Sequence, residues 1–283
     1  MNFGNKKVVG MATAVLAVAL LMLAFGVRRY LNSRPPEPSP FSVEIANKMT
    51  ADRFQPPGSD FSLPYRIHVP TNLEPGRKYP LVVYLHGAGD NGNDNVRHLG
   101  LAVAELIRLS QVGEPAFILA PQAPWGQNWV KVPGPPFLNF DLASLPESPA
   151  IQATRALIQT LPQRYAVDPD RLYLMGFSAG AAGCWDLLAR QPTHPFAAST
   201  MLSGAYDPSL AKSLARTPLW FFHGERDEVS PYTTTLDTVK ALQAQSGTPR
   251  YTLVEGVGHD TTEAAFAHGA FKWLLEQRRS TQP

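Results

Sequence analysis

The chain has 283 residues, enough for one well-buried core but not for two large domains. Apolar residues make up 44% and charged residues 17%, which excludes an intrinsically disordered chain. The net charge of +2 provides neither a basic field for nucleic acid nor an acidic field for a polycation. We therefore expect no nucleic-acid partner.

The N-terminal region is predicted to attach the protein to a membrane. After a short tail, 1–7, residues 8–27 read VVGMATAVLAVALLMLAFGV without a charge, and a helix of that length spans a bilayer core of about 30 Å. We expect a transmembrane signal anchor, with the rest of the chain on the extracytoplasmic side. The alternative is a signal peptide cleaved after the small residues 24–26, which would release a secreted protein.

Residues 28–55 are predicted to be a proline-rich linker, because NSRPPEPSP at 32–40 favours an extended polyproline conformation. From residue 56 to 283 we predict one catalytic domain in which strands and helices alternate. The expected strands are mostly continuous apolar runs, at 65–70, 81–87, 116–122, 171–177, 198–204, 219–224 and 250–256. The expected helices lie at 96–110, 149–165, 179–191, 232–246 and 261–279. This alternation predicts an α/β fold with a mainly parallel sheet and helices on both faces.

One long segment, 123–148, interrupts the alternation and is rich in proline, glycine and aromatic residues. It follows a strand whose end faces the expected site, so we predict that it forms a wall of the substrate pocket, with Trp125 and Trp129 as pocket residues. The alternative is a packed surface flap.

A candidate nucleophile lies in the run LYLMGFSAGAAG, residues 172–183. Ser178 stands between Gly176 and Gly180, where a strand is expected to turn sharply into a helix. Such a turn projects the serine outward, and small neighbours allow the strand and the helix to approach each other. The start of the helix also provides free N–H groups for an anion.

The base and the acid are expected on loops after later strands. His259, in VEGVGHD, follows the last predicted strand and is the predicted base, whereas His86 and His223 are predicted to be structural. Asp227, in FFHGERDEVSP, is the predicted acid that orients the imidazole. The rival acids are Asp207, Glu225 and Glu228.

Two backbone N–H groups are expected to bind the oxyanion. We predict those of Ala179, after the nucleophile, and Ala88, after the strand in LVVYLHGAGD, with Gly89 as the alternative to Ala88. The sequence contains no pattern typical of a metal or nucleotide site, so we expect no cofactor. The single cysteine, Cys184, cannot form an internal disulfide and is predicted to be a buried core residue.

Taken in order, the runs YPLVVYLHGAGDNGNDN, AFILAPQAPWGQNWV, RLYLMGFSAGAAGCWDLLAR, PLWFFHGERDEVSP and VEGVGHD resemble the α/β-hydrolase superfamily. More narrowly, residues 60–278 resemble bacterial phospholipase/carboxylesterase and dienelactone-hydrolase-like esterases, a group that includes predicted peptidases of the prolyl-oligopeptidase clan. The resemblance implies a Ser-His-Asp triad at Ser178, His259 and Asp227. This chain has no room for the propeller domain of prolyl oligopeptidases.

The expected function is therefore that of a serine esterase acting on a small-molecule ester through an acyl-enzyme. Two alternatives stay open. The same triad could cleave a thioester or a small peptide, or the domain could be a catalytically silent, membrane-tethered binding module.

Overall fold

The computed structural model describes residues 37–71, 73–191 and 193–279. The predicted tail, the predicted anchor at 8–27 and the first part of the predicted linker lie outside these residues. Within them, no helix combines the length and the apolar character needed to cross a bilayer.

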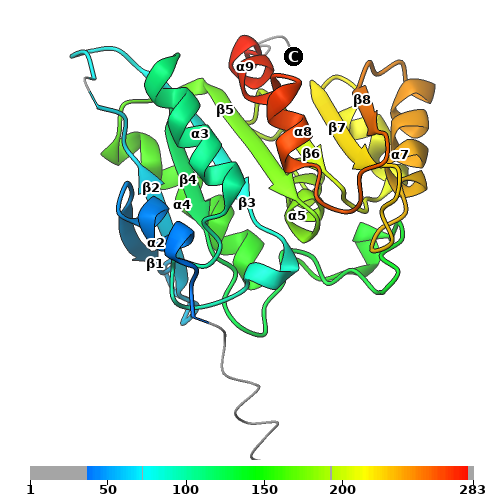
Figure 1. The fold of residues 1–283 in the computed structure, drawn as a ribbon, viewed down its shortest axis with the longest axis horizontal. Coiled ribbons are helices and arrows are strands. Elements are labelled where there is room, and N and C mark those ends of the chain that lie inside the picture. Colours follow the sequence, from blue (N-terminus) through cyan, green and yellow to red (C-terminus); the bar gives the residue numbers. More distant parts are fainter. Residues whose placement is uncertain (1–36, 72, 192, 280–283) are drawn as a thin grey trace, which may run out of the picture. The chain divides into compact units, whose positions relative to one another are not determined.

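Eight strands form one mixed sheet in the order β1-β2-β4-β3-β5-β6-β7-β8 (Figure 1). All neighbouring pairs from β4 to β8 are parallel, whereas β1 and β2 add an antiparallel edge. This mainly parallel sheet confirms the predicted fold class. The strands are β1 (Thr50–Phe54), β2 (Leu63–His68), β3 (Tyr79–Leu85), β4 (Phe117–Pro121), β5 (Val167–Phe177), β6 (Ala198–Leu202), β7 (Leu219–Gly224) and β8 (Arg250–Val254).

Helices cover both faces of the sheet because the side chains of a strand alternate between two apolar cores. In β3, Leu81, Val83 and Leu85 join one core and Val82 and Tyr84 join the other. The first core is covered by α4 (Pro149–Arg164), α5 (Ala179–Ala189), α6 (Ala211–Leu214) and α7 (Thr233–Ala244). The second is covered by α2 (Pro40–Ala46), α3 (Leu101–Val112), α8 (Thr262–Ala267) and α9 (Ala270–Glu276), of which α3, α8 and α9 lie in front in Figure 1.

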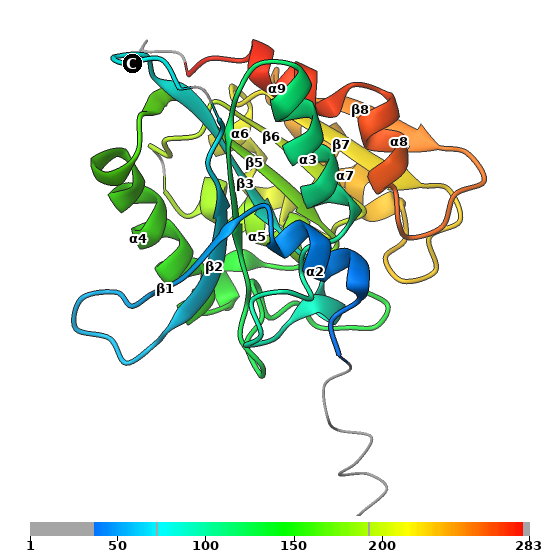
Figure 2. The ribbon, with the colours of Figure 1, turned by 60° about the vertical axis from the view of Figure 1, so that its left-hand side comes forward.

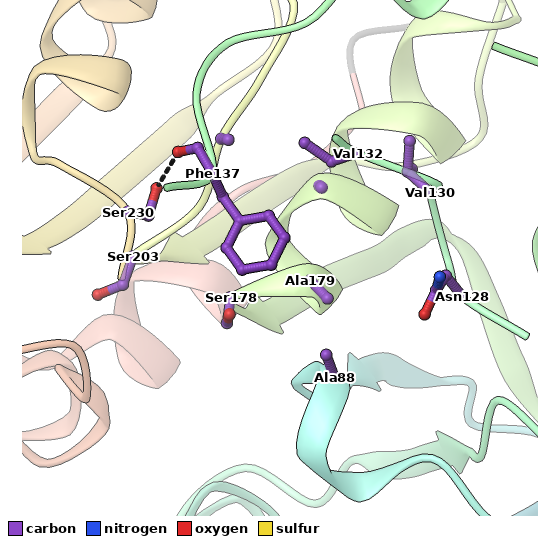
Figure 3. A pocket seen from close by; sticks show the side chains of 11 residues that line it. Ala88, Asn128, Val130, Val132, Phe137, Ser178, Ala179, Ser203 and Ser230 are labelled. Carbon is purple, nitrogen blue, oxygen red and sulfur yellow. Dashed lines mark hydrogen bonds between the residues drawn. The ribbon is translucent and has the colours of Figure 1, made fainter. Parts of the chain in front are cut away.

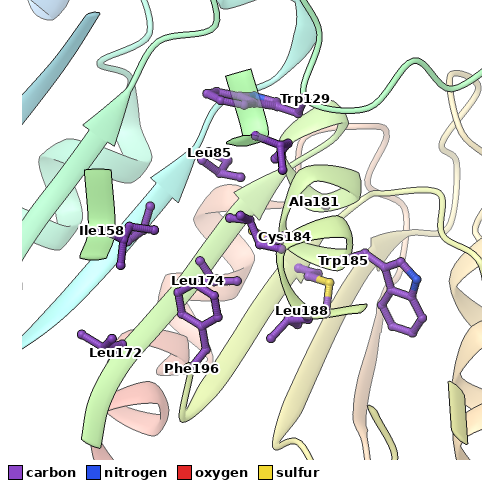
Figure 4. Packing of buried hydrophobic residues seen from close by; sticks show 14 of the residues in the cluster. Leu85, Trp129, Ile158, Leu172, Leu174, Ala181, Cys184, Trp185, Leu188 and Phe196 are labelled. Atoms are coloured by element: carbon purple, nitrogen blue, oxygen red, sulfur yellow. The ribbon is translucent and has the colours of Figure 1, made fainter. Parts of the chain in front are cut away.

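The central helix α5 packs deeply into the first core, and Cys184 is fully buried there, as predicted (Figure 4). Burial raises the pKa of this thiol far above its ordinary range, so the side chain is a neutral core residue. Gly183, also on α5, allows a close approach, because a Cβ there would lie 2.8 Å from the Cβ of Trp129.

The linker prediction for 28–55 is wrong over residues 40–54, which contain α2 and β1 (Thr50–Phe54). Ser39 caps α2 by accepting a hydrogen bond from the amide of Ser42 at 3.0 Å, and Pro40 occupies the first helical position, where its missing N–H costs nothing. Strand β1 then pairs with β2, from Thr50 opposite Ile67 to Phe54 opposite Leu63, at the sheet edge that Figure 2 shows. The proline-rich run thus leads directly into a helix and an edge strand of the domain.

The last predicted helix, 261–279, is divided in two. Gly269 has a φ of +80°, which breaks the helical path between α8 and α9. The apolar residues of both halves still face the same core, so the pattern predicted the buried face correctly but not the break.

Candidate active site

Ser178 occupies a strained turn between β5 and α5, with φ +54° and ψ −118°. The turn requires glycines on both sides. A Cβ at Gly176 would lie 2.4 Å from the carbonyl oxygen of Gly180, and a Cβ at Gly180 would lie 1.9 Å from that of Leu85. The amide of Ser178 donates to the carbonyl of Leu202 on β6 at 2.8 Å, which fixes the turn against the neighbouring strand. The close approach of β5, α5 and β3 therefore explains why both positions are glycine. The same contacts hold the backbone of Ser178 in its strained conformation.

His259 lies on the loop between β8 and α8 and contacts two of the predicted site residues. Its Nε2 is 2.8 Å from Ser178 Oγ, and its Nδ1 is 2.7 Å from Asp227 Oδ2. An ionised carboxylate can only accept, so Nδ1 donates to Asp227 and Nε2 accepts a hydrogen bond from the hydroxyl of Ser178. The imidazole is therefore placed to take a proton from the hydroxyl.

The loops that carry Asp227 and His259 are joined by their backbones. Arg226 donates its amide to the carbonyl of Val257 at 2.8 Å. At the end of β7, Gly224 lies so close to the second loop that a Cβ there would be 1.9 Å from the carbonyl oxygen of Gly258. These contacts hold the carboxylate and the imidazole in one arrangement although 32 positions separate them in the chain.

Asp227 is buried, and each of its carboxylate oxygens lies close to two nitrogen atoms. Oδ1 accepts the amides of Val229 and Ser230, both at 2.9 Å. Oδ2 accepts from His259 and also lies 3.0 Å from Nε2 of His223. Burial raises the pKa of Asp227, but the hydrogen bonds from His223, His259 and Ser230 outweigh it and hold the pKa well below its usual range. The carboxylate therefore stays ionised.

The rival acids have other contacts. Asp207 accepts the amide of Leu142 at 2.8 Å and that of Ser209 at 2.9 Å, so it joins two loops. Glu225 accepts the amide of Gly256 at 2.9 Å, and Glu228 is exposed. Of the four candidate acids, Asp227 is the one that contacts His259.

The two predicted oxyanion-hole residues lie beside the serine. Ala179 is the first residue of α5, and Ala88 is the first residue of the short 3₁₀ helix η1 (Ala88–Asp90). The amide of a first helical residue has no acceptor in its own helix. Both residues line the cavity next to Ser178, as Figure 3 shows. Nothing in the geometry requires the alternative, Gly89.

A cavity of about 150 Å³ opens at Ser178. Segment 123–148 forms one wall of it, as predicted, but through other residues: Asn128, Val130, Val132 and Phe137. Ala182, Ser203, Ala205 and Ser230 complete much of the rest. The sequence did not single out these residues, because nothing in a coil segment shows which side faces a cavity.

The predictions for Trp125 and Trp129 as pocket residues are wrong. Trp125 is 46% exposed, and the guanidinium of Arg97 lies 5.0 Å from the centre of its ring. Trp129 is 1% exposed and donates its indole N–H to the carbonyl of His86 at 2.9 Å. The large apolar ring of Trp129 anchors the segment in the core, while its smaller neighbours face the cavity.

His86 and His223 hydrogen-bond neighbouring loops, as predicted. His86 is fully buried, and its Nε2 accepts the amide of Ala123 at 2.9 Å while its Nδ1 donates to the carbonyl of Gly87 at 2.7 Å. Burial lowers the pKa of His86 to about 4, so it is neutral near pH 7. The contact of His223 with Asp227 was missed, although the i, i+4 spacing in HGERD could have indicated it. Within the described ranges, no three histidine, cysteine or acidic side chains are grouped to hold a metal ion.

The fold and the strand–serine–helix turn define an α/β hydrolase. The sequence matches the phospholipase/carboxylesterase family over residues 73–268, and the chain belongs to that family. A protein of Nocardia uniformis subsp. tsuyamanensis named as an esterase, NocK, is 28% identical over 173 residues, which are 59% of this chain and 46% of NocK.

Solved structures show the same fold. A thermostable esterase superimposes with a TM-score of 0.73 at 32% identity, over 83% of this chain and 64% of its own. Dipeptidyl peptidase 4 of Porphyromonas gingivalis superimposes with a TM-score of 0.59, over 81% of this chain and 35% of its own, but at 14% identity it shows the fold alone. This chain thus spans about half to two thirds of the length of the two esterases. The comparisons therefore show the family and the fold of this chain.

Proposed function

We propose that the protein is a serine hydrolase that cleaves carboxylic esters of small molecules through an acyl-enzyme. One observation carries the proposal: the imidazole of His259 joins Ser178 Oγ at 2.8 Å to Asp227 Oδ2 at 2.7 Å. This chain of hydrogen bonds is the arrangement that activates a serine hydroxyl as a nucleophile.

The first half-reaction forms the acyl-enzyme. Ser178 Oγ bonds to the ester carbonyl carbon while its proton moves to His259 Nε2, and the amides of Ala88 and Ala179 stabilise the developing oxyanion. The bond to the alcohol oxygen then breaks, and the alkoxide takes the proton from His259. Asp227 keeps the imidazole oriented and stabilises its positive charge throughout.

The second half-reaction repeats these steps with water. His259 accepts a proton from water, the hydroxide adds to the acyl carbon, and the bond to Ser178 Oγ breaks as the serine recovers its proton. The products are a carboxylic acid and the free enzyme. No redox partner is required, because hydrolysis changes no oxidation state.

The test is labelling with a fluorophosphonate probe together with hydrolysis of p-nitrophenyl butanoate. The wild type is expected to react with both, and Ser178→Ala is expected to lose both while its circular dichroism spectrum is unchanged. Ser213→Ala is the control, because Ser213 is exposed and donates to the carbonyl of Leu210. Undiminished labelling of Ser178→Ala would overturn the proposal.

Two outcomes would favour the alternatives. Faster turnover of a matched thioester or amide than of the ester would identify a thioesterase or a peptidase on the same triad. A folded wild type that no serine-directed probe labels would indicate a silent binding module. The membrane anchor at 8–27 stays a prediction, to be tested by fractionation of cells that express the full chain.

A further inference from the structure

His223 is a second histidine in contact with Asp227, at the same carboxylate oxygen that His259 contacts. The imidazole is fully buried at the end of β7, four residues before Asp227. Its Nε2 lies 3.0 Å from Asp227 Oδ2 and 2.8 Å from the carbonyl of Ser230. Oδ2 therefore contacts two imidazoles, and the proposed mechanism uses only one of them.

The surroundings of His223 determine which nitrogen carries its proton. Nε2 faces only acceptors, the carboxylate of Asp227 and the carbonyl of Ser230, so it must be the donor. Nδ1 lies 2.7 Å from the hydroxyl of Thr235 on α7, which can donate to it. The single proton on Nε2 is donated to the carbonyl of Ser230 and lies close enough to Asp227 Oδ2 to be shared with it, so His223 can contact Asp227 without a positive charge of its own.

His223 also links Asp227 to the loop that follows. Ser230 accepts from His223 through its carbonyl and donates its amide to Asp227 Oδ1 at 2.9 Å. The three residues thus form a small ring around the carboxylate: His223 bonds to Ser230, Ser230 bonds to Asp227, and Nε2 of His223 lies 3.0 Å from Oδ2. A freely rotating carboxylate would lose the alignment of Oδ2 with His259, and this ring prevents that rotation.

We propose that His223 is a positioning residue of the active site, which shares its Nε2–H between the carbonyl of Ser230 and Asp227 Oδ2 and so keeps this oxygen aligned with His259. The proposal rests on the proposed function, because it assigns His223 a role only through Asp227 and His259. It predicts that the donor at the Nε2 position matters for turnover, and not merely the volume that the ring fills.

The test compares His223→Leu with His223→Gln. Leucine fills the space without a donor, whereas the side-chain amide of glutamine reaches approximately the position of Nε2. A hydrogen bond to a charged group is substantial, so we expect kcat of His223→Leu to fall about 10-fold to 100-fold with KM within about threefold of the wild type. His223→Gln should recover most of this loss.

The pH profile provides a readout that a purely structural role would not change. His223 and His259 are the titratable groups that face Asp227, and both lower its pKa. Without the His223 N–H, the carboxylate of Asp227 stabilises the protonated imidazole of His259 more strongly. The acid limb of kcat/KM, which reports protonation of that base, should therefore move to higher pH in His223→Leu and stay near the wild-type position in His223→Gln. His268→Gln, at an exposed histidine, is the control.

An unchanged acid limb and a kcat within twofold of the wild type in His223→Leu would overturn the proposal, as would equal losses in the leucine and glutamine variants. If His223→Leu does not fold, His223→Asn replaces it, because its shorter amide reaches only the position of Nδ1. Equal kcat values for the asparagine and glutamine variants would then overturn the proposal. Fluorophosphonate labelling of the wild type separates the two proposals, since its absence contradicts the proposed function itself.

Discussion

The hydroxyl of Ser230 donates to the carbonyl of Phe137 at 3.0 Å, which fastens the wall of the cavity to the loop that carries Asp227. In the other direction, the amide of Phe137 donates a hydrogen bond to the carbonyl of Val229 at 3.1 Å. Phe137 thus forms a fixed boundary of the cavity rather than a loose flap.

This boundary predicts a limit on the acyl group. An apolar protein cavity of about 150 Å³ holds a molecule of the size of benzene. We expect kcat/KM for p-nitrophenyl hexanoate to exceed that for p-nitrophenyl dodecanoate by about 10-fold or more. The reason is that the methylenes of the longer chain that do not fit the cavity weaken binding of the transition state. Phe137→Ala should reduce this ratio, whereas Leu138→Ala, at an exposed neighbouring side chain, should not. Equal rates for the two esters in the wild type would contradict this size limit.

Gly180 is predicted to be irreplaceable. A Cβ at this position would lie 1.9 Å from the carbonyl oxygen of Leu85 and 2.8 Å from that of His86, and backbone atoms cannot move aside easily. We expect Gly180→Ala to lower the free energy of unfolding by about 3 kcal/mol and to abolish hydrolysis, because the start of α5 must shift away from Ser178. Urea unfolding and an ester assay measure the two effects.

Gly100→Ala is the matched control, because no atom lies within 4 Å of a Cβ there and its φ is −97°. Its free energy of unfolding should stay within about 1 kcal/mol of the wild type. Equal stability of the two variants would show that the contact at Gly180 does not constrain the turn.

Buried histidines predict a loss of stability in mild acid. Burial lowers the pKa of His86 to about 4 and that of His98 to about 3, whereas an unfolded histidine titrates near 6.5. These two histidines therefore bind more protons in the unfolded chain as the pH falls below about 6.5, so their contribution to the free energy of unfolding is highest above that pH and decreases toward pH 4. We expect each of the two histidines to contribute a loss of about 1–2 kcal/mol between about pH 7 and pH 5.

The measurement is urea unfolding of the wild type and His98→Gln at both pH values. Glutamine can replace the hydrogen bond from His98 Nε2 to the carbonyl of Ala120, which is 3.0 Å long, but it does not titrate. The variant should therefore lose less stability on acidification. An identical loss in both proteins would mean that His98 does not contribute.

The N-terminal edge of the domain is predicted to be necessary for stability. Arg66 on β2 donates to the carbonyls of Ala46 and Met49, and the apolar side chains of Ile45 and Met49 are buried. A chain that begins at residue 56 loses these contacts and exposes the edge of β2. We expect its free energy of unfolding to be lower by about 3 kcal/mol or more than that of a chain that begins at residue 37. Equal unfolding midpoints would contradict this assignment.

The order of strands and helices was predictable from the sequence because it depends on local patterns. Apolar runs such as 81–87 predict buried parallel strands, and the glycines around Ser178 predict a close strand–helix turn. The same reasoning selected His259 and Asp227, since loops after parallel strands meet at one edge of a sheet. Residues 40–54 were missed because the prolines before them resemble a linker, whereas Ser39 and Pro40 start a helix.

What the sequence determined by itself is thus the α/β class, the turn at Ser178 and a short set of candidate partners for the serine. Only the tertiary structure decided which acid meets the imidazole, that His223 lies against that acid, and that Phe137 rather than Trp125 or Trp129 faces the cavity. The physical reason is that these facts depend on distances between segments far apart in the chain and on the direction of side chains in a coil. Neither leaves a periodic pattern in the order of the amino acids.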